Sequence, residues 1–131
     1  MRKPEIIESV QQTAQIPTSE EAEAAVRATL HVFGERLSGG ETRELAARVP
    51  PHLANELPEE APGEHFDLHE FYVRVARYEG LPGDEMLARE HARAVAAALR
   101  TNLTGREFEH VATHLPSEYD DLLQTAPVQY Q

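Results

Sequence analysis

The fold of this chain is decided by a stretch that occurs twice. The sequence VRATLHVFGERLSGGETRELAARVP covers residues 26–50, and ARAVAAALRTNLTGREFEHVATHLP covers residues 92–116. When the first is shifted by 66 positions, nearly every apolar residue falls on an apolar residue of the second, and Pro50 falls on Pro116. Self-similarity at a fixed period is the signature of a tandem repeat. We therefore predict that the chain contains a structural unit and its duplicate.

Each copy is expected to be helical throughout. Its apolar residues are spaced by three and four, which places them on one stripe of a helix of about five turns. The stripe positions are Ala22, Val26, Thr29, Leu30, Phe33 and Leu37 in the first copy, and Ala88, Ala92, Val95, Ala96, Leu99 and Leu103 in the second. A shorter helix precedes each long one, and two more follow it, separated at Pro50 and Pro116 because proline cannot continue the helical hydrogen bonds. Strands are not expected, since no window alternates with period two.

These elements predict an all-α fold. Two tandem four-helix repeats would pack with pseudo-twofold symmetry into one compact helical bundle domain spanning residues 1–131. The repeats are expected at about 4–57 and 66–123, with a connector rich in proline and glutamate at 58–65 and a disordered tail at 124–131. A unit of roughly 60 residues buries only about 60% of its surface, so we expect the two repeats to share a core.

The composition excludes several classes of function. Twelve basic residues against 23 acidic ones give a net charge of −11. Binding to nucleic acid or an anionic membrane needs clustered basic side chains, so neither partner is expected. The chain has no cysteine for a disulfide or a thiolate ligand. It also has no run of eighteen apolar residues and no apolar segment after its first basic residues, so we expect a cytoplasmic protein.

The stretch Leu37-Ser38-Gly39-Gly40-Glu41 is similar to the LSGGQ signature of ABC-type ATPases. That signature works with a glycine-rich phosphate loop that contains a lysine, G-x-x-x-x-G-K-[ST], and the only lysine here is Lys3. In the second copy the stretch becomes Leu103-Thr104-Gly105-Arg106-Glu107. The two copies share a hydroxyl residue followed three positions later by glutamate, which is the pattern of a helix capping box. We predict that Ser38 with Glu41, and Thr104 with Glu107, are structural caps.

Two histidine pairs have the four-residue spacing that can hold zinc on one helix face. In the first pair, Asp67 is predicted to cap the helix that carries His69, so His65 lies outside that helix. This pair is therefore not expected to bind metal.

The second pair, His110 and His114, lies on one flank of a short predicted helix. Its equivalents in the first copy are Glu44 and Arg48, which have an ordinary ion-pair spacing and favour a solvated surface. His110 and His114 remain the candidate metal ligands.

Arg27 and Arg93 are charged residues that recur beside the apolar stripe of both long helices. A pair of guanidinium groups that recurs in both copies could bind an anionic ligand at the junction of the two repeats. The alternative is that each arginine pairs with a nearby glutamate, as Glu23 could do for Arg27.

A combined pattern in the second copy extends beyond the helix stripe. It consists of Phe71-x-x-Arg74-Val75-Ala76, then His91-Ala92-Arg93-Ala94-Val95 with Leu99, then Leu115-Pro116-x-Glu118-Tyr119-x-x-Leu122. This pattern resembles the bacterial family of domains of unknown function numbered 2267, and the first copy fits it more loosely. The resemblance implies a bacterial origin and an all-helical duplicated domain. Since that family has no established activity, it transfers no catalytic residue.

The sequence leaves two functions open, and it predicts no catalytic residue and no cofactor. The first is a protein-interaction or self-association module, whose contact candidates are Tyr72, Tyr78 and Met86. The second is a domain, perhaps enzymatic, that binds a small molecule or metal between the repeats, through Arg27 and Arg93 or through His110 and His114. A deep polar pocket between the repeats would favour the second function, and a filled interface would favour the first.

Overall fold

The computed structural model describes residues 3–47, 49–58, 63–102 and 105–123, and every regular element within them is a helix. In chain order these are α1 (Lys3–Ala14), α2 (Ser19–Arg36), α3 (Gly39–Ala46), α4 (Pro51–Ala54), α5 (Leu68–Tyr78), α6 (Glu85–Asn102), α7 (Gly105–Thr113), the 3-10 helix η1 (Ser117–Tyr119) and α8 (Asp120–Leu123). The all-α prediction is confirmed. None of these helices is long and apolar enough to cross a membrane. The predicted tail and residues 59–62 of the predicted connector lie outside the described residues.

The helices of the two predicted repeats follow the same order. The elements α1 to α4 correspond to α5, α6, α7 and the pair of η1 with α8, and both long helices contain 18 residues. Equivalent residues cap the long helices. Thr18 Oγ1 accepts the Glu21 amide at 3.1 Å, and Asp84 Oδ1 accepts the Leu87 amide at 3.3 Å. The sequence repeat is therefore matched by a repeat of local helix signals.

The short helices α1 and α5 end in the same turn. Gln15 follows α1 with φ of 54°, and Gly80 occupies the equivalent place after α5 with φ of 80°. In each turn the next amide reaches back five residues, from Ile16 to the Gln11 carbonyl at 3.0 Å and from Leu81 to the Ala76 carbonyl at 2.7 Å. This is the Schellman ending of a helix, and its left-handed position suits glycine better than glutamine.

Gln15→Gly is expected to raise the free energy of unfolding by about 0.5–1 kcal/mol. A side chain in the left-handed region costs about 1–2 kcal/mol, and part of the gain is lost to the greater freedom of glycine in the unfolded chain. Urea unfolding followed by circular dichroism measures the change. The reciprocal control, Gly80→Gln, should lower stability by a similar amount, and a Gln15→Gly protein no more stable than its parent would contradict strain at this turn.

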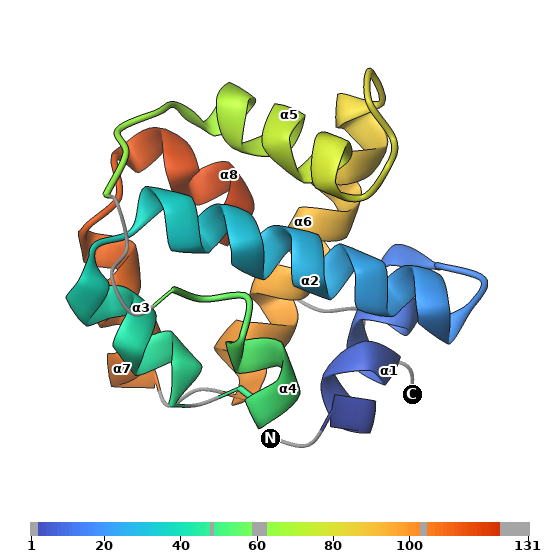
Figure 1. Cartoon of the computed structure of the whole chain (residues 1–131), viewed down its shortest axis with the longest axis horizontal. Helices are drawn as coiled ribbons and strands as arrows, with labels where there is room; N and C mark the ends of the chain where they lie inside the picture. The colour runs from blue at the N-terminus through green and yellow to red at the C-terminus, as the bar shows by residue number, and fades with distance from the viewer. Residues whose placement is uncertain (1–2, 48, 59–62, 103–104, 124–131) are drawn as a thin grey trace.

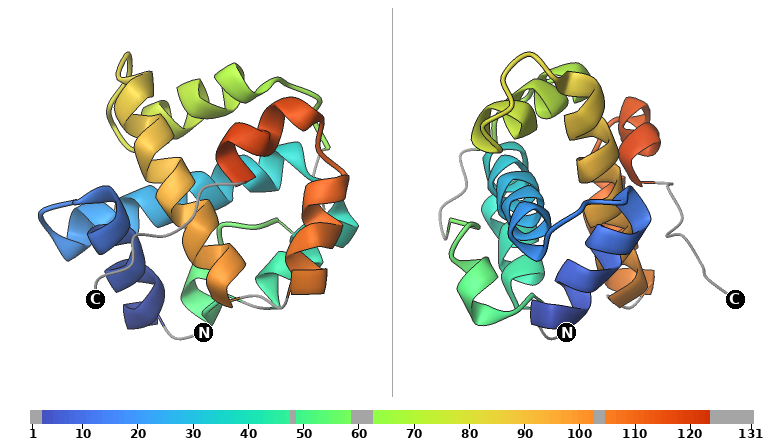
Figure 2. Two further views of the ribbon diagram at one scale, coloured as in Figure 1. Left: turned by 180° about the vertical axis from the view of Figure 1, so that it is seen from behind. Right: turned by 90° about the vertical axis from the view of Figure 1, so that its right-hand side faces the viewer.

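The helix α6 lies at the centre of the fold. It contacts α1, α2, α5 and α8, and the view from behind in Figure 2 shows it crossing α2. Six consecutive residues of α6, from Ala94 to Leu99, are buried. The sequence predicted one buried stripe on this helix. The burial is wider because neighbours from both repeats surround α6, and its alanines allow their close approach.

The two repeats share one hydrophobic core. The short helix α1 packs on α6, and α5 packs on α2, so each short helix contacts the long helix of the other repeat (Figure 1). Phe71 of α5 lies 5.0 Å from Phe33 of α2 and 5.9 Å from Tyr119 of η1, measured between ring centroids. A twofold relation would require such reciprocal contacts, and the pseudo-twofold symmetry itself stays a prediction.

Ser38 and Glu41 form a capping box at the start of α3. The Ser38 amide donates to Glu41 Oε1 at 3.3 Å, and the Ser38 hydroxyl donates to the other carboxylate oxygen. Burial opposes ionisation of Glu41, but the hydrogen bonds from Ser38 outweigh it and lower the pKa of the carboxyl. Of the equivalent pair, Thr104 lies outside the described residues, and the cap by Glu107 stays a prediction.

Ser38→Ala is expected to lower the free energy of unfolding by about 1 kcal/mol, because the helix loses its cap and Glu41 loses a hydrogen bond. Chemical unfolding of the two proteins measures the difference. Ser38→Asp keeps a capping oxygen but adds charge beside Glu41. Its free energy of unfolding should therefore lie between those of the parent and of Ser38→Ala. An unchanged midpoint in Ser38→Ala would show that the hydroxyl does not stabilise this helix start.

Candidate functional site

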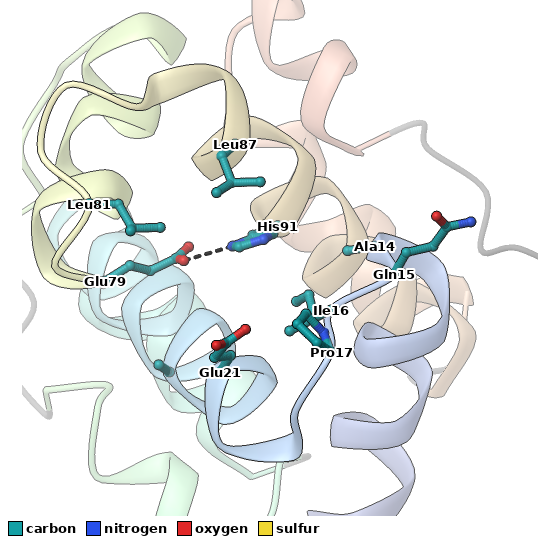
Figure 3. Close-up of a pocket in the computed structure, with 10 residues that line it drawn as sticks. Ala14, Gln15, Ile16, Pro17, Glu21, Glu79, Leu81, Leu87 and His91 are labelled. Atoms are coloured by element: carbon teal, nitrogen blue, oxygen red, sulfur yellow. Dashed lines mark hydrogen bonds and ion pairs between the residues drawn. The ribbon is translucent and has the colours of Figure 1, made fainter.

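A pocket of about 390 Å³ lies between the turn that joins α1 to α2 and the turn that joins α5 to α6 (Figure 3). Its apolar lining residues are Ala14, Ile16, Pro17, Ala24, Leu81 and Leu87, and its polar ones are Gln15, Glu21, Glu79 and His91. Several come in repeat-equivalent pairs, such as Ile16 with Leu81 and Glu21 with Leu87. Both predicted repeats thus contribute residues to the lining, so the pocket lies at their junction.

Glu79 and His91 form a buried hydrogen-bonded pair in this pocket. Glu79 Oε2 lies 2.7 Å from His91 Nδ1, and the two side chains are only 3% and 9% exposed. Glu79 is the C-cap of α5, and His91 lies in the second turn of α6. The tight turn that begins at Gly80 folds α6 back against α5 and brings the two side chains together. Their repeat equivalents are Ala14 and Ala25, so only the second repeat carries the pair.

The pair presents hydrogen-bond acceptors. A carboxylate only accepts, so Nδ1 of His91 carries the proton of the bond to Glu79, and in the neutral imidazole the lone pair is then on Nε2. Nε2 has no partner among the described residues. Glu79 Oε1 is buried and has no hydrogen-bond partner there either. A neutral imidazole held in this way can accept a hydrogen bond from a bound molecule.

The predicted ligand-binding arginines have different acidic neighbours. Arg27 binds Glu23 and Glu56, each at 3.2 Å, which is the surface pairing that the sequence offered as the alternative. Arg93 lies instead within electrostatic reach of Asp121. The structure therefore does not gather Arg27 and Arg93 around one anion site.

The predicted metal ligands, His110 and His114, lie side by side on α7 with ring centroids 5.0 Å apart. His110 Nδ1 is 2.7 Å from the Glu44 carboxylate, and His114 Nδ1 donates to the His110 carbonyl at 2.8 Å. Among the described residues, no group of three His, Cys, Asp or Glu side chains is placed to hold a metal ion. Glu44 and His110 occupy equivalent positions of the two predicted repeats.

Arg74 connects the repeats through acidic side chains. Its guanidinium contacts Glu70 at 2.9 Å, Glu35 of the first repeat at 3.1 Å and Glu64 at 3.3 Å, and it lies 3.9 Å from the Phe66 ring centroid. Although burial opposes the charge, these hydrogen bonds raise the pKa of Arg74. Three carboxylates around one guanidinium make this a structural link and not an anion site.

Tyr72 was predicted as an exposed contact residue, and this prediction is wrong. The side chain is buried at 6% exposure, and its hydroxyl donates to Asp121 Oδ2 at 2.8 Å. Arg89 binds both oxygens of the same carboxylate, at 2.9 Å and 2.6 Å. These bonds, that of Arg89 first, lower the pKa of Asp121 to about 2. The apolar pattern could not distinguish Tyr72 from a surface residue because α8 lies about 50 residues away.

Asp121→Asn is expected to lower the free energy of unfolding at pH 7 by about 0.5–1 kcal/mol, a value discounted because the pair is partly exposed and screened by solvent. The pKa of Asp121 in the folded protein, about 2, lies below its ordinary value of 3.8. Its contribution is therefore complete above pH 3.8 and is lost as the pH falls toward 2. Urea unfolding of the parent and of Asp121→Asn, at pH 7 and at pH 2, measures the difference in their free energies of unfolding. The neighbouring exposed Asp120→Asn is the control, and a difference between parent and Asp121→Asn that persists at pH 2 would contradict this assignment.

Sequence analysis did not identify Glu79 or His91 as candidates. His91 was noted only within the family pattern. A signal was present, since the equivalent of His91 is Ala25, and a polar residue in place of a buried alanine is unusual. The sequence around Glu79 gave no such indication, because a glutamate just before the glycine that ends a helix is usually a surface residue.

The comparison with protein families agrees with the sequence pattern. The model of the family described as "Uncharacterized conserved protein (DUF2267)" matches residues 3–122. No match was found among curated proteins. The matched range contains both repeats and every residue that lines the pocket, and it confirms the resemblance noted in the sequence. The chain therefore belongs to the DUF2267 family of uncharacterised conserved proteins.

Proposed function

We propose that this protein binds a small, largely apolar molecule in the pocket between its repeats. The observation that carries the proposal is the hydrogen-bonded pair of Glu79 and His91 in a pocket whose other walls are mainly apolar. Ligand sites in proteins combine an apolar lining with a few polar groups, in volumes of about 300–1,000 Å³. The pocket between the repeats has this size and composition.

The fold does not need this polar pair. The first repeat has Ala14 and Ala25 at the equivalent places and forms the same helices. A buried, hydrogen-bonded carboxylate is also weak evidence for stability, because the loss of water around the charge offsets the gain from its partner. A role in binding accounts for the pair where a role in folding does not.

Titration of the protein with 1-hexanol, followed by amide NMR, tests the proposal. We expect saturable shifts of the amides of Ile16, Leu81 and Leu87. Ala24→Trp places a large ring at the pocket wall and should abolish them, while Ala47→Trp, at an exposed alanine outside the pocket, should leave them unchanged. Linear shifts without saturation, or equal behaviour of the two tryptophan variants, would contradict a binding pocket.

Self-association is the second candidate function, and the exposed side chain of Met86 favours it. Met86 is 82% exposed. Tyr78 is 44% exposed, but its hydroxyl donates to Glu35 at 2.7 Å and its ring contacts His31. Sedimentation velocity over a range of concentrations should show an increase in size that Met86→Glu removes. A monomer at all concentrations would exclude this candidate.

A further inference from the structure

We infer that the pocket takes a primary ammonium group carried on a short apolar chain. The inference rests on the proposed function and adds the chemical class of the molecule. It starts from the two acidic residues, Glu21 and Glu79, that line the pocket, one from each repeat. Among the described lining residues none is lysine or arginine. An anionic molecule would meet two carboxylates and no fixed positive charge.

The second step concerns the unpartnered acceptor. The Glu79 side chain is 97% buried, and its Oε1 atom has no hydrogen-bond partner among the described residues. A buried acceptor without a partner is costly, and a bound donor removes that cost. The site therefore lacks a hydrogen-bond donor.

The third step concerns the number of donors. With its Nδ1 proton directed at Glu79, the neutral imidazole of His91 has a further acceptor at Nε2. In Figure 3, Glu79 and His91 lie together, with Leu81 and Leu87 near them and Ile16 and Pro17 opposite. An ammonium group brings three donors and a positive charge to such acceptors, and its chain can contact the apolar walls. A hydroxyl brings one donor and no charge.

Three probes of equal chain length separate these possibilities: n-hexylamine, 1-hexanol and hexanoate, titrated at pH 7 in 0.15 M salt to screen the general charge of the protein. We expect hexylammonium to bind about tenfold more tightly than 1-hexanol, because a charge-assisted hydrogen bond is stronger than a neutral one. Hexanoate should bind more weakly than either.

Matched variants test the role of Glu79. Glu79→Gln keeps the shape and should remove the preference for hexylammonium over 1-hexanol. Glu21→Gln, at an exposed position, should reduce it in part. Glu90→Gln makes the same change in net charge at an exposed site outside the pocket lining and should leave the preference intact.

The outcomes distinguish this inference from the proposed function. If 1-hexanol or hexanoate binds as tightly as hexylammonium, the inference fails and the apolar pocket stands. If the preference survives both Glu79→Gln and Glu21→Gln, the inference also fails, because the charge of the whole protein would explain it. If none of the three probes binds, the proposed function fails with it.

Discussion

His91→Leu is expected to lower the free energy of unfolding by about 3 kcal/mol. The substitution removes the hydrogen bond to Glu79 and leaves its carboxylate, 3% exposed, without a partner in the core. Removal of a partner that leaves a buried charge uncompensated typically costs about 3–5 kcal/mol. Guanidinium unfolding followed by circular dichroism measures the loss.

A double variant separates the contribution of the pair from the cost of leaving one of its polar groups buried without a partner. Glu79→Met with His91→Leu fills the same space with apolar atoms, and its stability should return to within about 1 kcal/mol of the parent or exceed it. The surface pair of Glu44 and His110 is a matched control, because its side chains are 41% and 51% exposed. His110→Leu should therefore change stability by less than about 1 kcal/mol. Equal losses for His91→Leu and His110→Leu would show that the pocket pair is not buried in solution.

The double variant also links stability to binding. A protein with the apolar pair should fold normally and lose the preference for hexylammonium, since both acceptors are gone. Stability retained with the preference lost is the pattern of a binding group. Stability lost together with binding would assign the pair to the fold.

Phe71→Ala is expected to lower the free energy of unfolding by about 4 kcal/mol. Phe71 is fully buried and contacts the rings of Phe33, Tyr72 and Tyr119, so its removal leaves a cavity between the two repeats. Large-to-small substitutions of a buried phenylalanine cost about 3–5 kcal/mol, because the surroundings relax only in part. Equilibrium unfolding in urea measures the change.

Two milder substitutions are the controls for Phe71→Ala. Phe71→Leu keeps most of the volume and should cost less than half as much. Tyr119→Phe keeps the ring but removes the hydroxyl, which donates to the Phe66 carbonyl at 2.8 Å, and should cost about 1 kcal/mol. A loss below about 1.5 kcal/mol in Phe71→Ala would show that the repeats do not share a tightly packed core. Separate unfolding transitions for the two repeats would contradict the shared core directly.

The local structure of this protein was predictable from its sequence. The spacing of apolar residues predicted the long helices α2 and α6, and the hydroxyl and glutamate of the LSGGE stretch predicted the start of α3. These features depend on residues within one or two helical turns of each other, so the information needed to predict them is local. The same stretch first looked like a phosphate site, and its second copy identified it as a cap.

The candidate site was not predictable in this way. Glu79 and His91 are twelve residues apart, and nothing in that interval indicates that one side chain meets the other or that both are buried. Their hydrogen bond depends on the angle at which α6 folds back on α5, and the pocket depends on the turn after α1 lying opposite, more than 60 residues earlier in the chain. The sequence by itself therefore determined the helices and many of their ends, because short-range hydrogen bonds and periodic burial control them. Only the tertiary structure decided which polar side chains lost water and met in a pocket, because burial depends on how helices distant in sequence pack together.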